Sequence, residues 1–223
     1  MTPPKFVNYP LSPNQYLRTI TAKAQIYLHH TAGNSSAVNT ARFWNGNEDR
    51  IATSYIIGGR VKNSSTEKDG DIVELFDTQY WAYHLGLKQE VFSEKKIAYQ
   101  SLDKISIGIE ICCWGQITKM ADGIYRNYVN GIVPPEEVIE LPTAFKGYKF
   151  WHNYTDAQIE SLKSLLQYLC DKHKIDKTYR DDIFGVTERA LRGENGIFTH
   201  NSVRKDKVDI YPHPKLIEML KTL

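Results

Sequence analysis

The sequence predicts an α/β protein in which a single domain, residues 1–223, is built around a central mixed β-sheet flanked by helices. Strand-like runs alternate with helical patterns along the chain, which favours one sheet with helices packed on it. Residues 104–111 alternate strictly, with isoleucine at every odd position, and this period of two is typical of a strand. A length of 223 residues allows one large domain whose core needs no disulfides.

The first part of the chain predicts an arm, a strand and a helix. Residues 1–20 are rich in proline and polar groups, so we expect an extended arm that lies on the domain. Residues 24–30, AQIYLHH, form a strand-like run that ends in a Thr-Ala-Gly turn. Ser35 or Ser36 can cap the short helix that follows, because serine oxygens accept hydrogen bonds from the first backbone N–H groups of a helix.

Two further strands and a long irregular stretch come next. Residues 54–57 precede a Gly-Gly pair and residues 71–76 follow an Asp-Gly turn, so both are predicted as strands that neighbour each other. Residues 114–154 contain three prolines and lack a clear period. A structureless loop of this length is unusual in a compact domain, so we predict an irregular insertion with short strands or turns of its own. It either packs as a surface excursion or forms one wall of a binding groove.

The C-terminal part predicts two helices. Thr155 and Gln158 form a capping box, after which the apolar residues fall on one helical face and belong to the core. A last short helix is expected to begin at Pro214, since proline is tolerated in a first turn. Between these helices, residues 197–199 form a short apolar run directly before His200.

Composition narrows the classes of function. The formal net charge of +2, without a basic stripe, gives no reason to expect a nucleic-acid partner. No apolar run is long enough to insert into a membrane, and the N-terminus lacks the pattern of a signal peptide. The three cysteines form no CxxC pair and indicate free buried thiols. We therefore expect a monomer that is synthesised and folded in the cytoplasm; a target outside the cell would require another component for release.

The groups of a catalytic zinc site are present but far apart in the sequence. His29 and His200 supply imidazoles, and Asp209 supplies a carboxylate next to the ammonium of Lys207. Three protein ligands leave one position of a tetrahedral zinc ion open to water, which distinguishes a catalytic from a structural site. Adjacent histidines on a strand face opposite sides, so His30 belongs to the core if His29 is a ligand. A single histidine is more often structural than a metal ligand. The zinc hypothesis therefore depends on whether these three residues meet in space.

Three other polar residues, Glu110, Lys207 and His84, have two possible interpretations each. Glu110 shares the parity of two small residues on its strand, so it is either a solvated carboxylate or a general base beside a metal. Lys207 lies two residues before Asp209, so on an extended segment both point to the same side. It is therefore either a surface lysine or an oxyanion partner. His84 can line a cleft or cap a turn, and His213, between two prolines, is expected at the surface.

Taken in order, these segments resemble the zinc-dependent N-acetylmuramoyl-L-alanine amidases, the type-2 amidases related to peptidoglycan-recognition proteins. Residues 26–33, IYLHHTAG, are similar to the first zinc-ligand strand of that family, and residues 106–111, SIGIEI, to its glutamate-bearing strand. Thr199-His200 followed by Lys-Val-Asp at 207–209 resembles the closing Gly-His…Lys-x-Asp motif. Residues 83–86, YHLG, resemble a Trp-His-x-Gly segment at the substrate groove. Each motif is weak alone, whereas four in the same order are specific.

The resemblance implies a single amidase domain and a set of site residues. It implies three Zn²⁺ ligands, His29, His200 and Asp209, and two catalytic residues, Glu110 and Lys207. It also places two residues near the substrate, His84 and Tyr55. Some relatives carry a tyrosine on the second strand where Thr53 stands here, with Tyr55 close by, so Glu110 becomes the main candidate for the base.

The implied activity is hydrolysis of the amide between N-acetylmuramic acid and L-alanine, with peptidoglycan or a muropeptide as substrate. Such an enzyme acts on the cell wall, for example as a phage endolysin; a recycling amidase and an injected toxin are the other settings. Three alternatives remain: a non-catalytic peptidoglycan-binding module, a regulatory inhibitor of a partner enzyme, and a hydrolase that cuts within the stem peptide. Filled ligand positions favour the enzyme over the binding module.

Overall fold

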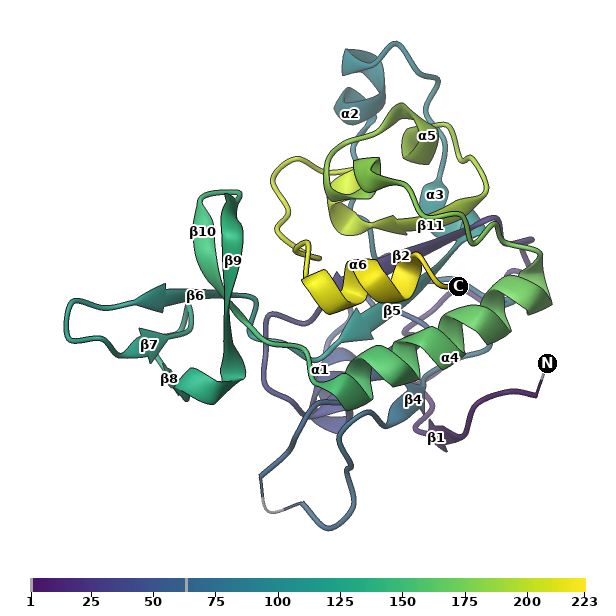
Figure 1. The fold of residues 1–223 in the computed structure, drawn as a ribbon. Coiled ribbons are helices and arrows are strands. Elements are labelled where there is room, and N and C mark those ends of the chain that lie inside the picture. Colours follow the sequence, from purple (N-terminus) through teal and green to yellow (C-terminus); the bar gives the residue numbers. More distant parts are fainter. Residues whose placement is uncertain (1, 63) are drawn as a thin grey trace.

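The computed structural model describes residues 2–62 and 64–223, so Met1 of the predicted arm lies outside the described residues. A six-stranded sheet in the order β1-β4-β3-β5-β2-β11 forms the centre (Figure 1). Its strands are β1 (Phe6–Asn8), β2 (Gln25–His30), β3 (Tyr55–Ile57), β4 (Ile72–Glu74), β5 (Ser106–Ile111) and β11 (Gly196–Thr199). Strands β3 and β4 pair antiparallel, whereas β1–β4, β3–β5, β5–β2 and β2–β11 are parallel. The predicted α/β class with a mixed sheet is confirmed.

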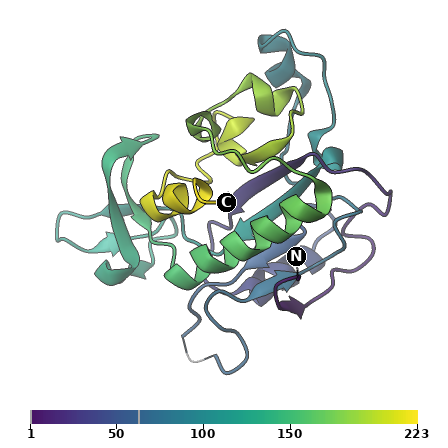
Figure 2. The same ribbon diagram turned by 45° about the vertical axis from the view of Figure 1, so that its right-hand side comes forward.

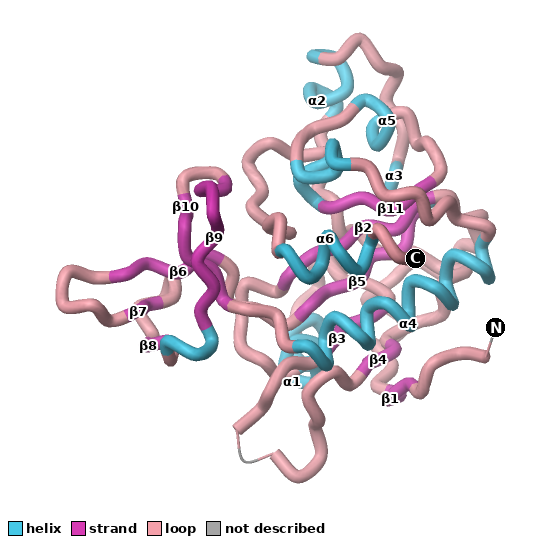
Figure 3. Tube along the Cα trace, viewed as in Figure 1, coloured by secondary structure: helices cyan, strands magenta, loops and turns pink. Residues whose placement is uncertain are grey.

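Helices cover both faces of this sheet. α4 (Asp156–His173) and α6 (Pro214–Leu220) lie over one face, and α1 (Ala37–Asn45) lies against the other (Figures 1 and 3). The side chains of β5 alternate between the two faces of the sheet, since neighbouring residues of a strand point to opposite faces. Its isoleucines are buried in the same apolar cluster as the leucines of α4. The serine, glycine and glutamate of β5 therefore point to the opposite face of the sheet, which is the face that carries the candidate site.

Several shorter helices connect these elements. They are α2 (Gln89–Glu94), α3 (Leu102–Ile105) and α5 (Glu188–Leu191), with short 3-10 segments at 135–137, 181–184 and 200–202. The first residues of the predicted strand 104–111 belong to α3, so the strand begins only at Ser106. Among the described residues, no helix has both the length and the apolar character needed to cross a membrane.

The long helix α4 begins where the sequence predicts. The Thr155 hydroxyl accepts a hydrogen bond from the backbone N–H of Gln158 at 3.1 Å, and the Gln158 side chain accepts one from the backbone N–H of Thr155 at 3.1 Å. This capping box satisfies two N–H groups that a helix end leaves unpaired. The predicted Ser36 cap of α1 is also present, because the Ser36 hydroxyl accepts from the backbone N–H of Asn39 at 3.0 Å.

The N-terminal arm is more regular than predicted. Residues Phe6–Asn8 form β1, which pairs in parallel with β4 and becomes the edge of the sheet. Leu17 forms a further bridge with Trp81. A strand of three residues carries too little alternation to be recognised in the sequence, and its pairing with a strand about 65 residues away supplies the hydrogen bonds that hold it.

The segment 114–154 forms a second, five-stranded sheet in the order β8-β7-β6-β10-β9. Its strands are β6 (Gln116–Lys119), β7 (Tyr125–Arg126), β8 (Ile132–Val133), β9 (Val138–Phe145) and β10 (Tyr148–His152). It projects beside the central sheet (Figures 1 and 2). Short strands were expected, but the description of this insertion as irregular is wrong. β9 exposes residues on both of its faces, so its sequence lacks the apolar alternation of a strand with one buried face.

His213 is buried, which corrects the expectation that it lies at the surface. It is 1% exposed and caps α6: its Nδ1 accepts from the backbone N–H of Leu216 at 3.4 Å, and its Nε2–H donates to Asn153 Oδ1 at 2.8 Å. Burial lowers the pKa of His213 to about 4, and Lys215 acts in the same direction. The cap requires a lone pair on Nδ1, so the ring must stay neutral.

We expect His213 to weaken the fold in mild acid. Below its ordinary pKa of 6.5 the unfolded chain binds a proton that the folded chain excludes down to about pH 4, so stability falls as pH falls through that window. His213→Asn, which keeps a capping side chain that does not titrate, should remove about 2 kcal/mol of the loss in unfolding free energy between pH 7 and pH 5. Urea unfolding of both proteins at the two pH values, with a chelator present, measures this. An equal loss in both would show that His213 is not held neutral.

Candidate metal and catalytic site

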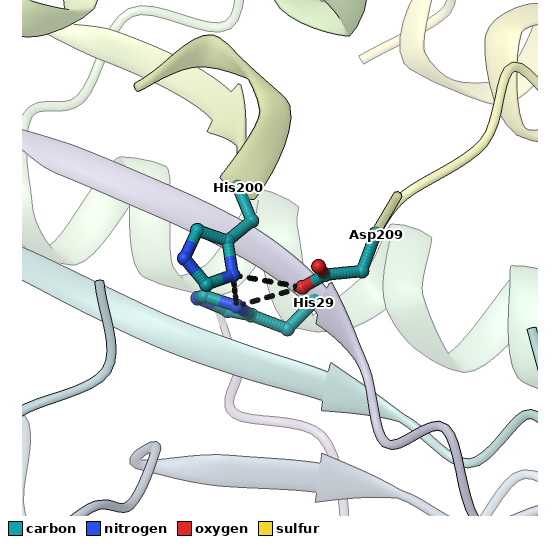
Figure 4. Close-up of side chains that lie close together, drawn as sticks. All are labelled: His29, His200 and Asp209. Carbon is teal, nitrogen blue, oxygen red and sulfur yellow. Dashed lines mark hydrogen bonds and ion pairs between the residues drawn. The ribbon is translucent and has the colours of Figure 1, made fainter. Parts of the chain in front are cut away.

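Three side chains remote in sequence meet at the carboxyl ends of neighbouring parallel strands. His29 lies at the end of β2, His200 follows β11, and Asp209 comes from the loop after it (Figure 4). The two Nδ1 atoms are 3.1 Å apart, and Asp209 Oδ2 lies 3.2 Å from His29 Nδ1 and 2.9 Å from His200 Nδ1. The convergence that the sequence-based hypothesis requires is present. The parallel register brings it about, because Thr199 pairs with Leu28 and so sets the next residues side by side.

The spacing of these atoms fits a tetrahedral metal ion. Nitrogen and oxygen donors bind Zn²⁺ at about 2.0–2.2 Å, so two donors at tetrahedral positions are about 3.3 Å apart. The three separations of 2.9 to 3.2 Å are close to that value. Of the described residues, this is the group of histidine, cysteine and acidic side chains that is close enough to hold one ion. Two imidazoles and one carboxylate form a donor set typical of zinc.

Hydrogen bonds and charge prepare the group for a cation. His200 Nε2 lies 3.0 Å from the Leu85 carbonyl, which can only accept, so Nε2 carries the proton and Nδ1 keeps its lone pair toward the centre. Burial lowers the pKa of His29 to about 4. Burial opposes the ionisation of Asp209, but positive charge at His200 and His29 lowers its pKa well below the ordinary value, and a cation bound between them would act in the same direction. A neutral imidazole and an ionised carboxylate are the forms that bind a metal.

Glu110 faces the same side of the sheet as His29. The two residues are paired in the register of β5 and β2, and paired residues point to one face. Glu110 is half-buried, and its Oε2 is enclosed without a hydrogen-bond partner among the described residues. Burial raises the pKa of Glu110 well above its ordinary value, Asp209 adds to the rise, and Lys207 opposes it. A carboxylate with an enclosed oxygen that has no hydrogen-bond partner, beside a candidate metal group, is suited to proton transfer.

Lys207 is half-buried on the loop that carries Asp209. Its positive charge lowers the pKa of Glu110 and of His29, so its ammonium group is close enough to act on both. The insertion holds this loop, because Lys146 at the β9–β10 turn donates to the backbone carbonyls of Lys205, at 2.9 Å, and of Lys207. The predicted groove wall is thus in contact with the loop that brings Lys207 and Asp209 to the site.

Of the two residues predicted to bind substrate, one lies at the site and the other does not. His84 belongs to the site, but its side chain is 4% exposed and its Nδ1 lies 3.0 Å from His29 Nε2, behind the candidate ligand. Burial lowers the pKa of His84 well below its ordinary value. Tyr55 is not brought to the site. Its register partner is Ile109, so its side chain enters the core on the opposite face, where its hydroxyl donates to Glu74 at 3.0 Å. The prediction that Tyr55 binds substrate is therefore wrong.

Other residues near the site confirm or extend the sequence analysis. His30 points into the core, with Nδ1 3.3 Å from the Tyr154 hydroxyl, as expected for the neighbour of a ligand. Thr53 lies against Gly108 on the face of the site. Sequence reasoning missed Asp103, whose Oδ1 accepts from the backbone N–H groups of His84 and Leu85. Its position in a short helical turn gives no motif by which it could have been found.

A mixed sheet with two histidines and a carboxylate at its strand ends defines a class of α/β protein with a candidate site for metal-assisted hydrolysis. The sequence identifies the family within that class: the chain belongs to the N-acetylmuramoyl-L-alanine amidases, whose family model matches residues 21–214. No significant match to this chain was found among curated proteins.

Solved structures share the fold at low sequence identity. An endolysin mutant from Bacillus subtilis superposes with a TM-score of 0.54 at 14% identity, covering 98% of this chain and 97% of that one. The Staphylococcus aureus hydrolase AmiA, solved with its ligand, gives a TM-score of 0.54 at 12% identity and covers 99% and 83%. The catalytic domain of PlyG gives 0.55 at 12% identity and covers 98% and 94%. At these identities the comparison establishes the fold.

Proposed function

We propose that this protein hydrolyses the amide bond between N-acetylmuramic acid and L-alanine in peptidoglycan and that it depends on zinc. One observation carries the proposal: His29, His200 and Asp209 present three converging donor atoms next to the free carboxylate oxygen of Glu110. Membership of the amidase family supports the choice of bond. The cell wall is then the place of action, and an endolysin-like role belongs to the same proposal.

The metal and the protein have separate tasks in this reaction. His29, His200 and Asp209 would hold the ion, and Zn²⁺ bound there would supply Lewis acidity toward the substrate carbonyl and the attacking water. Ionised Glu110 accepts a proton from the attacking water as the new C–O bond forms. It then passes the proton to the nitrogen of L-alanine as the C–N bond breaks, so one water is consumed for each amide. A raised pKa suits Glu110 to both steps, because the group must take up a proton and release it.

Lys207 stabilises the oxygen of the reacting carbonyl. Negative charge builds on that oxygen in the transition state, and a fixed ammonium group nearby lowers the energy of that state more than the energy of the bound substrate. We expect Lys207→Met to reduce kcat by about 100–1000-fold while the bound zinc content stays unchanged. Turnover assays together with metal analysis test this. Lys205→Met, on the same loop, is the matched control; a Lys207 variant with normal turnover would remove the role.

Digestion of purified sacculi tests the function itself. Wild-type protein should release material in which intact glycan strands are separated from stem peptides that begin with a free L-alanine amine, as shown by mass analysis. A chelator should stop the release, and added Zn²⁺ should restore it. Binding of sacculi without release would identify a peptidoglycan-binding module, and fragments cut within the peptide would identify a different hydrolase. Either result contradicts the proposal.

A further inference from the structure

We propose that His84 is a positioning residue that, together with the backbone carbonyl of Leu85, fixes both candidate histidine ligands with Nδ1 as the free nitrogen. The inference rests on the proposed metal site, and it adds a residue that touches neither the metal nor the reacting bond. His84 was expected at a substrate groove. Its ring instead fills the space behind His29, buried between β2, β5 and the segment that carries it.

A chain of hydrogen bonds with one direction leads from β5 to His29. The Ser106 hydroxyl lies 2.8 Å from the backbone carbonyl of Leu102 and donates its proton there. Its oxygen is therefore left to accept from His84 Nε2–H at 2.9 Å. In the neutral ring of His84, Nδ1 is then an acceptor, and it accepts a hydrogen bond from His29 Nε2–H at 3.0 Å. His29 consequently turns the lone pair of Nδ1 toward His200 and Asp209.

The second histidine is fixed by the next residue of the same segment. The carbonyl of Leu85 accepts from His200 Nε2–H at 3.0 Å. Two consecutive residues thus orient both imidazoles. The side chain of His84 accepts a hydrogen bond from His29, and the backbone carbonyl of Leu85 accepts one from His200. Ligand histidines in metal sites usually donate their second N–H to such an outer partner, which sets the tautomer and the direction of the ring.

Asp103 anchors this segment. Its Oδ1 accepts from the backbone N–H groups of His84 at 2.9 Å and of Leu85 at 3.0 Å. The Nε2 atom of His84 is 3.9 Å from the same oxygen, too far for a hydrogen bond, so the carboxylate holds the main chain rather than the ring. Asp103 therefore fixes the main chain of the segment by hydrogen bonds, and Ser106 fixes the orientation of the His84 ring.

Gly108 provides the space for the His84 ring. A Cβ atom at this position would lie 3.1 Å from His84 Nδ1 and 2.6 Å from Thr53 Cγ2. The glycine stands on β5 between Ser106 and Glu110, on the face that carries the site. The Ser-Ile-Gly-Ile-Glu run of β5 therefore has three tasks on one face: the serine sets the direction of the hydrogen bonds, the glycine makes room for the ring, and the glutamate faces the candidate metal group.

Two variants of His84 separate an acceptor role from simple packing. His84→Phe keeps a ring and removes both nitrogens, whereas His84→Asn places an amide oxygen near the position of Nδ1 and can still accept from His29. Zinc affinity is measured by competition with a chromophoric chelator. Loss of an outer partner lowers metal affinity about 10–100-fold in other sites, so we expect a loss of that size for His84→Phe and a smaller loss for His84→Asn.

The spectroscopic readout is the tautomer of His29 in the metal-free protein. Two-bond ¹H–¹⁵N spectra of histidine-labelled protein distinguish a protonated Nε2 from a protonated Nδ1. We expect wild type and His84→Asn to hold the proton on Nε2, and His84→Phe to show a mixture of tautomers. A role in packing alone would leave the tautomer unchanged. Thermal unfolding checks that both variants fold; if His84→Phe does not, Ser106→Ala replaces it and should shift the tautomer of His84.

The outcomes distinguish this inference from the proposed function. Wild-type protein that binds no zinc would refute the metal site, while the tautomer spectra would still test the positioning role. Wild type that binds zinc, combined with a His84→Phe variant of equal affinity and unchanged His29 tautomer, would overturn the positioning role and leave the metal site standing.

Discussion

Replacing Asp209 with alanine is expected to remove bound zinc and, with it, the hydrolysis of peptidoglycan. The carboxylate is the charged member of the three-ligand group, with its Oδ2 2.9 and 3.2 Å from the two histidine nitrogens. Zinc binding to small four-ligand sites contributes about 10–16 kcal/mol, or about 2.5–4 kcal/mol per ligand. One ligand fewer should therefore weaken zinc binding by about 100–1000-fold. Metal analysis after dialysis and chelator competition measure the loss.

Asp206→Ala provides the control for the loss of charge. Asp206 lies three residues before Asp209 on the same loop, but its carboxylate is exposed and pairs with Arg204 at 2.6 Å. It should retain zinc and activity. Asp209→Asn refines the test, because it keeps the shape and removes the charge. If the Asp209→Ala protein bound zinc as tightly as wild type, the ligand set would be wrong.

Replacing Glu110 with glutamine is expected to reduce turnover by about 100–10,000-fold without loss of zinc, since general acid–base groups contribute on that scale. Glutamine has nearly the same shape but cannot accept and release a proton. The raised pKa of Glu110 predicts the direction of the pH dependence. The base must be ionised, so wild-type kcat should fall as pH falls through that pKa. The residual activity of the variant should lack this acidic limb.

Glu74→Gln is the matched control for Glu110. Glu74 is also a strand glutamate, but it accepts from the Tyr55 hydroxyl on the opposite face of the sheet from the site. It should retain normal turnover. Steady-state assays on sacculi and metal analysis of each variant make the comparison. A Glu110→Gln protein with wild-type turnover would exclude Glu110 as the base, and one that lost zinc would make its role structural.

Much of the fold could be predicted because its signals are local. The period of two in β5 and the capping box of α4 are set by neighbours a few residues apart; α4 begins where the sequence placed it, and β5 lies within the predicted strand but begins two residues later. The strands of the insertion were missed individually, because short strands with exposed faces carry no alternation. The burial of His213 was missed because its partner Asn153 is distant in the sequence.

For the candidate site, too, some features could be predicted from the sequence and others could not. By itself the sequence determined which groups were available, since the order of motifs pointed to two histidines, Asp209, Glu110 and Lys207. Only the tertiary structure decided which of them meet. Parity along one strand tells which residues share a face, whereas the register between strands decides which faces coincide; it put Glu110 beside His29 and Tyr55 on the far side. The placement of His84 behind His29 depends on packing among segments that are remote in the chain, and no local pattern encodes it.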